Sequence, residues 1–266
     1  MRAVDVATAS MSNSAHVDPS RDIAEQEARR VGRPPRSAAS AHLRARRIAI
    51  RLAKVVIGVV AGYYVLCVVL LVVYRFLAPP ITGVQLQRRV ESWISRRAYR
   101  QEKRFVPYSR LPRHVSRAVI AAEDGRFWRH RGFDLAEMRA ASTEIFDGEL
   151  PRGASTITQQ LVKNLFGCAC RNPVRKFYDL ALTVPAEVIL GKERILELYL
   201  NNAEWGRGVF GVEAAARHHY GTGARSLSRS QAAGLAALLP NPLRRTPGNT
   251  GEYRAEILRR MAYRGW

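Results

Sequence analysis

The sequence is poor in acidic residues, with 22 Asp and Glu against 43 Lys and Arg in 266 positions and a net charge of +21. Such a positive excess suits an anionic partner, which includes nucleic acid, the phosphates of a membrane surface and an anionic substrate. Because carboxylates are few, each one that lies in an apolar setting becomes a candidate for chemistry. The scarcity of acids therefore directs the search for a site to a small set of residues.

Cysteine is also rare, and its three copies do not make a disulfide framework. Cys67 lies in a long apolar run, whereas Cys168 and Cys170 are closer together than the usual C-x-x-C redox or zinc spacing, so their state stays open. Neither "RGASTITQQ" nor "GRGVFGVEAAA" fits a phosphate-binding loop or a dinucleotide fingerprint. The sequence indicates no cofactor, and it leaves open whether a divalent cation, Mg²⁺ or Mn²⁺, takes part.

One uncharged run, "VVIGVVAGYYVLCVVLLVVY" over residues 55–74, is long enough to cross a bilayer. As a helix it measures about 30 Å, the thickness of the hydrocarbon core. We predict one transmembrane helix over residues 55–77. A cleaved signal peptide is disfavoured, because the run exceeds an ordinary signal-peptide core and "FLAPPITG" offers no clear cleavage site.

Basic residues before this run set the expected orientation. They are Arg44, Arg46, Arg47, Arg51 and Lys54, and the positive-inside rule therefore places residues 1–54 in the cytoplasm. Arg75, Arg88 and Arg89 on the far side weaken this signal. The expected location is the inner membrane, crossed once, with residues 80–266 on the periplasmic side.

Residues 1–54 are rich in Ala, Ser and Arg and show no sustained apolar periodicity, so we predict a disordered basic tail. No aromatic residue interleaves its charges, which disfavours a nucleic-acid-binding arm.

Residues 80–266 carry helical periodicity. Apolar residues at 115, 118, 119 and 122 predict a helix that ends at Glu123, and the T-x-x-Q pattern of Thr156 and Gln159 predicts the start of another. Further helices are expected over residues 174–190, over "KERILELYLNN", and from Ser228 to Pro240. The one weak strand pattern is "RFVPYS", residues 104–109. The expected fold is a mostly α-helical domain behind a single N-terminal transmembrane helix.

Four segments resemble, in order and spacing, the motifs of peptidoglycan glycosyltransferases, which polymerise lipid II into glycan strands. They read "AAEDGRFWRHRGFD", "RGASTITQQLVKNLF", "RKFYD" and "KERILELYLN". Two further segments, "AEWGRGVFGVEAAARHHYG" and "LSRSQAAGLAALLPNPLR", resemble the monofunctional biosynthetic transglycosylase branch. The resemblance implies a lysozyme-like helical domain on the outer face of the cytoplasmic membrane, with lipid II and the growing strand as substrates. Because the sequence ends at Trp266, no penicillin-binding transpeptidase domain is expected.

Glycosyl transfer of this kind needs a base for the attacking hydroxyl and positive charge for the leaving diphosphate. Glu123 ends an apolar helix, where desolvation raises the pKa of a carboxyl towards the range that suits a general base. From local sequence alone, a surface acid at a helix end is the commoner explanation. The resemblance reverses that preference and implies that Glu123 takes the proton from the acceptor's 4-hydroxyl, while Asp124 orients the site.

The resemblance also implies the substrate-binding residues. Lys163 and Arg171 are expected to contact the donor diphosphate, and Arg175 and Lys176 extend the same basic cluster. Ser155, Thr156, Gln159 and Gln160 are expected to line the substrate face, although Thr156 and Gln159 also fit a helix cap.

One position departs from the family pattern. The third motif normally ends in a catalytic Glu, and this sequence has Asp179 there, which is shorter by one methylene. A displacement of about 1 Å can cost about a hundredfold in a positioned site. Glu187 lies two turns further along, displaced by about 12 Å, so Asp179 remains the expected second catalytic carboxylate.

Three other functions stay open. A lytic transglycosylase or lysozyme-like hydrolase would use a single Glu as acid, but it has no diphosphate to hold with a basic cluster. A catalytically weak scaffold that recruits cell-wall synthesis proteins is supported only by Asp179. A membrane-tethered nucleic-acid binder is supported only by the net charge. We expect lipid II, the growing strand and membrane lipid as partners, and no nucleic acid.

Overall fold

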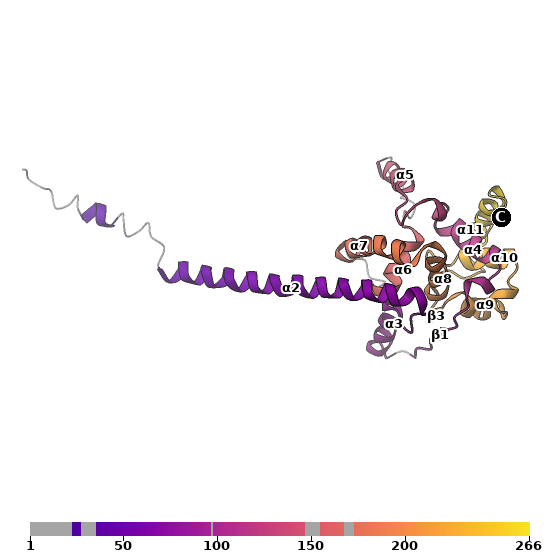
Figure 1. Cartoon of the computed structure of the whole chain (residues 1–266), viewed down its shortest axis with the longest axis horizontal. Coiled ribbons are helices and arrows are strands. Elements are labelled where there is room, and N and C mark those ends of the chain that lie inside the picture. The colour runs from indigo at the N-terminus through magenta and orange to yellow at the C-terminus, as the bar shows by residue number, and fades with distance from the viewer. Residues whose placement is uncertain (1–22, 28–35, 97, 147–154, 168–172) are drawn as a thin grey trace, which may run out of the picture. The chain divides into compact units, whose positions relative to one another are not determined.

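A computed structural model of the protein describes residues 23–27, 36–96, 98–146, 155–167 and 173–266 (Figure 1). The chain divides into two units, Met1–Val60 and Ala61–Trp266. In the first unit the described residues form a short helix at 23–27 and the beginning of helix α2 (Arg36–Phe76). Helix α2 continues into the second unit, which contains every other element described below.

Residues 36–54 of the predicted tail are helical in the structure, where α2 begins at Arg36. This stretch is rich in Ala and Arg, which favour helix, and an apolar helix that has already formed extends at little further cost. Residues 1–22 and 28–35 of the predicted tail lie outside the described residues. Among the described helices, one segment, Arg44–Phe76 with a mean hydropathy of 2.8, is long and apolar enough to cross a membrane. It contains nearly all of the predicted span.

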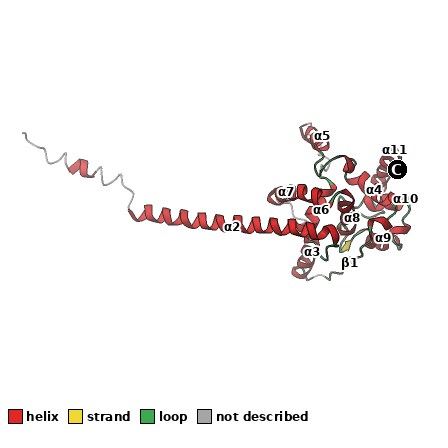
Figure 2. Cartoon of the chain, viewed as in Figure 1, coloured by secondary structure: helices red, strands yellow, loops and turns green. Residues whose placement is uncertain are grey.

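The second unit is mostly helical (Figure 2). Its helices are α3 (Gly83–Ile94), α4 (Arg113–Glu123), α5 (Leu135–Phe146), α6 (Ile157–Phe166), α7 (Pro173–Leu190), α8 (Lys192–Asn202), α9 (Val212–Tyr220), α10 (Arg229–Ala236) and α11 (Gly251–Tyr263). Short 3₁₀ turns, η1 (Tyr108–Arg110), η2 (Phe127–Arg129) and η3 (Ala224–Ser226), join some of them. The predicted helix ending at Glu123, the helix over 174–190 and the helix over "KERILELYLNN" are confirmed as α4, α7 and α8.

A small three-stranded sheet has the order β1 (Glu102–Lys103), β3 (Val209–Phe210), β2 (Glu204–Gly206). Strand β1 runs parallel to β3, with Glu102 opposite Val209, and β2 runs antiparallel to β3. The weak strand pattern over residues 104–109 does not form a strand. The side chain of Asn201 accepts from the Val106 amide at 2.7 Å and donates to the Val106 carbonyl at 2.9 Å, so these backbone groups are satisfied without a ladder.

Helix caps fix where two of the helices begin. The Thr156 hydroxyl accepts from the Gln159 backbone amide at 3.3 Å, as predicted, but the Gln159 side-chain oxygen accepts from Lys176 Nζ at 3.3 Å, so only half of the capping box forms. At Ser228 and Gln231 both halves are present. The difference arises because Lys176 Nζ donates to the Gln159 oxygen, whereas the Gln231 oxygen accepts from the Ser228 backbone amide at 2.8 Å.

The core places helix α6 among three neighbours, α3, α7 and α8, while α4 packs against α10 and α11. Figure 1 shows α6 between α7 and α8. The predicted stripe of Ile157, Leu161 and Leu165 is buried. This packing brings the N-terminus of α6 to the C-terminal end of α4, where the candidate carboxylates lie.

Candidate active site

A cleft of about 1170 Å³ opens where the end of α4, the start of α6, the first turns of α7 and helix α11 meet. Every predicted site residue that the structure describes lines this central cleft: Glu123, Asp124, Ser155, Thr156, Gln159, Gln160, Lys163, Arg175, Lys176 and Asp179. Arg171 lies outside the described residues, as do Cys168 and Cys170. Residues from three separated motifs thus converge on one cavity.

Glu123 is the last residue of α4 and faces the N-terminal half of α6. The Gln160 side-chain amide donates to Glu123 Oε2 at 2.7 Å, and the Tyr199 hydroxyl donates to Gln160 Oε1 at 2.8 Å. Burial raises the pKa of Glu123, and the Gln160 hydrogen bond and the charges of Lys163 and Arg245 oppose this rise. A carboxylate that is desolvated but faces cations is suited to accept a proton in the cleft.

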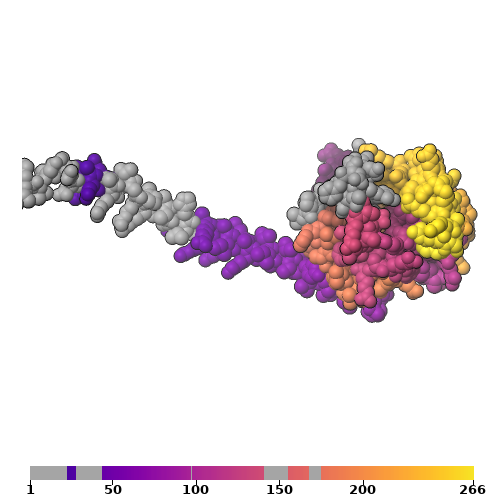
Figure 3. All heavy atoms as spheres, turned by 90° about the horizontal axis from the view of Figure 1, so that it is seen from above, coloured from indigo at the N-terminus to yellow at the C-terminus, as the bar shows by residue number. Residues whose placement is uncertain are grey.

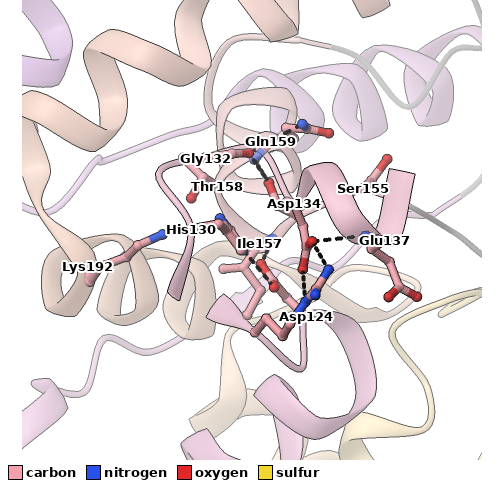
Figure 4. Close-up of polar contacts among 12 residues, drawn as sticks. Asp124, His130, Gly132, Asp134, Glu137, Ser155, Ile157, Thr158, Gln159 and Lys192 are labelled. Carbon is pink, nitrogen blue, oxygen red and sulfur yellow. Dashed lines mark hydrogen bonds and ion pairs between the residues drawn. The ribbon is translucent and has the colours of Figure 1, made fainter. Parts of the chain in front are cut away.

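Asp124 is buried and fully engaged (Figure 4). Its Oδ2 accepts from the Ile157 amide at 3.0 Å, and its Oδ1 lies 2.8 Å from His130 Nε2. Ile157 is the first residue of α6, so the carboxylate satisfies an amide that the helix leaves open and lies at the positive end of its dipole. Asp124 therefore fixes the start of α6 against the end of α4, which supports the predicted orienting role.

Among the described residues, one group has the composition and spacing of a metal site: Asp124, His130 and Asp134, whose ligand atoms lie within 4.8 Å of one another. Both of its carboxylates already have partners outside the group. Asp134 accepts from Arg126 through both oxygens. It also accepts from the Glu137 amide at 3.0 Å (Figure 4). Because a guanidinium occupies one carboxylate and a backbone amide the other, this group does not fit a divalent cation.

The other end of the cleft is basic. Arg175 Nη1 lies 3.0 Å from Asp179 Oδ2, in an ion pair whose angle falls short of hydrogen-bond geometry. Lys176 Nζ donates to Ser155 Oγ at 3.1 Å and to Gln159 Oε1 at 3.3 Å, which ties α7 to the start of α6. The predicted basic cluster is thus assembled from two helices.

Burial shifts the pKa values of the acidic and the basic members of this cluster in opposite directions. It raises the pKa of Asp179, and the charges of Arg175, Lys176 and Lys163 oppose the rise. It lowers the pKa of Lys163, with Arg175 acting in the same direction and Glu123 and Asp179 opposing it. At both groups desolvation outweighs the opposing charges, so the pKa of Asp179 stays above and the pKa of Lys163 below its ordinary value.

Glu187, the alternative considered for the second carboxylate, is engaged elsewhere. Its Oε1 accepts from Thr158 Oγ1 at 2.5 Å and from Lys192 Nζ at 2.8 Å, and Glu187 is not among the residues that line the cleft. Asp179 instead lies close to the end of α6, since a side-chain carbon at Gly167 would come within 3.3 Å of Asp179 Oδ1. The shorter carboxylate therefore sits where α6 and α7 approach each other closely.

Sequence reasoning missed the C-terminal wall of the cleft. This wall includes Arg245, Tyr253, Arg259, Arg260 and Arg264. The Tyr253 hydroxyl donates to the Ala122 carbonyl at 3.0 Å, and Arg245 stacks over the Tyr253 ring at 5.1 Å. Figure 3 shows the yellow C-terminal residues bordering the magenta surface of residues around 120–140. The available signal was the buried apolar pair Ile257 and Met261, whose i, i+4 spacing predicts a helix and places Arg260 and Arg264, at i+3 and i+7 from Ile257, beside its inward face.

Comparison with known proteins identifies the family. A family model described as Transglycosylase matches residues 90–263. A biosynthetic peptidoglycan transglycosylase of Ectopseudomonas mendocina (strain ymp) is 45% identical over 194 residues, covering 73% of this chain and 79% of that protein. A protein of the same name from Stutzerimonas stutzeri (strain A1501) is 43% identical over 208 residues, covering 78% of this chain and 84% of that protein. Another from Pseudomonas fluorescens (strain Pf0-1) is 47% identical over 175 residues, covering 66% of this chain and 73% of that protein. With its lysozyme-like helical domain and its carboxylate-bearing cleft, the chain belongs to the transglycosylase family.

Proposed function

We propose that this transglycosylase is a peptidoglycan glycosyltransferase that polymerises lipid II with Glu123 as its base. The donor is the growing strand on undecaprenyl diphosphate, and the acceptor is the 4-hydroxyl of the N-acetylglucosamine of lipid II. The observation that carries the proposal is a single cleft lined by both a desolvated carboxylate, Glu123, and a cluster of basic residues.

In the proposed reaction, Glu123 takes the proton of the 4-hydroxyl as its oxygen attacks the donor's anomeric carbon. The bond from that carbon to the diphosphate oxygen breaks, its electron pair leaves with the diphosphate, and the configuration inverts. The raised pKa of Glu123 supports this role, because a base is most effective when its pKa approaches the working pH. Gln160 holds one carboxylate oxygen and thereby sets the direction of the other.

The basic cluster receives the leaving group. Lys163, Arg175 and Lys176, together with Arg171, are proposed to contact the diphosphate, since charge-assisted bonds strengthen as negative charge develops on the leaving oxygen. Asp179 is proposed as the second carboxylate of the site. Its ion pair with Arg175 supports a role in holding the cations that face the diphosphate.

We also propose that the protein lies in the inner membrane with its catalytic domain on the periplasmic side. The apolar segment of α2 and the basic residues before it support this topology. Reporter fusions test it: a periplasmic reporter should be inactive at position 40 and active at position 266. The reverse pattern would overturn the topology.

A hydrolytic function is disfavoured by the basic cluster and by the names of the relatives, which are biosynthetic. The test is incubation of the purified full chain with labelled lipid II in the presence of penicillin. A ladder of polymer supports the proposal. Release of short muropeptides from preformed strands, with no polymer from lipid II, would contradict it.

A further inference from the structure

The part of α2 within the second unit, from Ala61 onwards, is built into the catalytic domain. Cys67 and Leu71 are fully buried and Tyr74 is 9% exposed, whereas Val65 and Val69 on the other side are 60% and 52% exposed. The buried positions recur at i, i+4 and i+7, which is one face of a helix. This segment therefore has an inward face that packs on protein and an outward face suited to lipid.

The inward face contacts helix α7 next to a proposed catalytic residue. The Tyr63 ring stacks on the Tyr178 ring, with centroids 5.4 Å apart and planes 24° apart, and Tyr64 meets the same ring edge-on at 6.2 Å. The Tyr178 hydroxyl donates to Cys67 Sγ at 3.4 Å. Tyr178 directly precedes Asp179, so these contacts fix the turn of α7 that carries the carboxylate.

The same tyrosine reaches helix α6. The Tyr63 hydroxyl donates to the carbonyl of Phe166, the last residue of α6, at 2.7 Å. The next residue, Gly167, donates its amide to the Lys163 carbonyl at 2.9 Å and lies against the Asp179 carboxylate. Tyr63 is therefore hydrogen-bonded to α6 and stacked on α7, the two helices that carry the basic cluster.

We propose that Tyr63 is a positioning residue of the catalytic centre, and that the inward face of α2 sets the spacing of α6 and α7 as well as tethering the domain. Tyr63 acts through Phe166 on the turn that carries Lys163 and through Tyr178 on the turn that carries Asp179. A displacement of about 1 Å in a positioned site can lower turnover about a hundredfold. This inference rests on the proposed roles of Lys163 and Asp179.

The test measures polymerisation of labelled lipid II by full-length variants in liposomes at matched amounts of inserted protein. Tyr63→Leu removes the ring stack and the hydroxyl but keeps the helix apolar, and it should lower kcat about tenfold or more with a small change in KM. Tyr63→Phe removes only the hydroxyl and should have a smaller effect in the same direction. Val65→Leu, on the outward face of the same helix, is the matched control and should stay within about twofold of the parent, since it touches no special feature.

A double-mutant cycle with Asp179→Glu separates positioning from general loss of structure. Substitutions at residues that depend on the same packing have non-additive effects. The change in kcat of the double variant should therefore differ from the product of the two single changes by about threefold or more. If Tyr63→Leu keeps the parent's kcat, or if its effect simply multiplies with that of Asp179→Glu, the positioning role is wrong. If Tyr63→Leu fails to insert or fold, Tyr63→Phe decides, and parent-like kcat in that variant would overturn the proposal. Failure of both the parent and Val65→Leu to polymerise lipid II would instead overturn the proposed function.

Discussion

The two proposed catalytic carboxylates, Glu123 and Asp179, are both desolvated, but their nearest partners differ. Glu123 accepts from a neutral amide, Gln160, whereas Asp179 is paired with the guanidinium of Arg175. Burial raises the pKa of both, and cations oppose the rise at both. A carboxylate that is bonded to an amide keeps the capacity to take a proton, while one that is paired with Arg serves better as a fixed negative charge. The comparison assigns proton transfer to Glu123 and the arrangement of cations to Asp179.

The largest expected effect comes from removing the base. Glu123→Gln keeps the size and the hydrogen-bonding capacity of the side chain but cannot accept the proton, so turnover of lipid II should fall by about 10²–10⁴. Polymerisation rates measured on protein with unchanged circular dichroism check this. Near-parental turnover by folded Glu123→Gln would remove the role of Glu123.

The next effect is expected at the charge-holding carboxylate. Asp179→Asn removes the negative charge that faces Arg175 and should lower turnover about a hundredfold, as expected when a positioned group is displaced. Asp179→Glu restores the residue usual in the family and serves as the control, which should remain active. Equal turnover in the parent and in Asp179→Asn would show that turnover does not need the negative charge of Asp179.

A smaller effect on turnover is expected from removing the side-chain amide of Gln160, which donates to Glu123. Gln160→Met removes a hydrogen bond that favours the charged form of Glu123, so the pKa of Glu123 should rise further. The acid limb of the pH–rate profile should then move to higher pH, and turnover at low pH should fall about tenfold, in line with about 1.5 kcal/mol for a bond to a charged group. An acid limb that stays in place, or moves to lower pH, would contradict this reading.

The smallest effect is expected from the C-terminal wall. Tyr253→Phe removes the hydrogen bond to the Ala122 carbonyl and should lower the free energy of unfolding by about 1 kcal/mol, with little change in turnover. Tyr263→Phe is the control, because Tyr263 is 93% exposed. Denaturant unfolding of both variants in detergent gives the comparison. A larger loss in Tyr263→Phe than in Tyr253→Phe would mean that α11 does not support the end of α4 through this bond.

The spacing of apolar residues predicted the helices that bury one stripe, because such a stripe is removed from water when the segment forms a helix that packs on the core. It placed the end of α4 at Glu123 and the bounds of α7 within a residue. The failures have local causes. Asn201 satisfies the backbone of Val106 from a distant part of the chain, and Lys176 on α7 donates to the Gln159 oxygen that would complete its capping box. Neither contact leaves a trace in neighbouring sequence.

Motif order predicted which residues would meet in the cleft, since three ordered motifs were sufficient to name ten of its described lining residues. It did not predict the Arg-rich wall of α11, because that helix carries no motif and its residues reach the site only through packing on α4. It also treated α2 as a simple tether. The aromatic contacts of Tyr63 with α7 depend on tertiary packing that an uncharged run does not reveal.

The pH dependence of kcat/KM for labelled lipid II tests the division of labour between the two carboxylates most directly. The parent should show an acid limb with a pKa above the ordinary glutamate value, and Asp179→Glu should retain that limb. Glu123→Gln should lose the limb and leave only a low, pH-independent rate. An acid limb that persists in Glu123→Gln but disappears in Asp179→Asn would contradict the account, because it would make Asp179 the base.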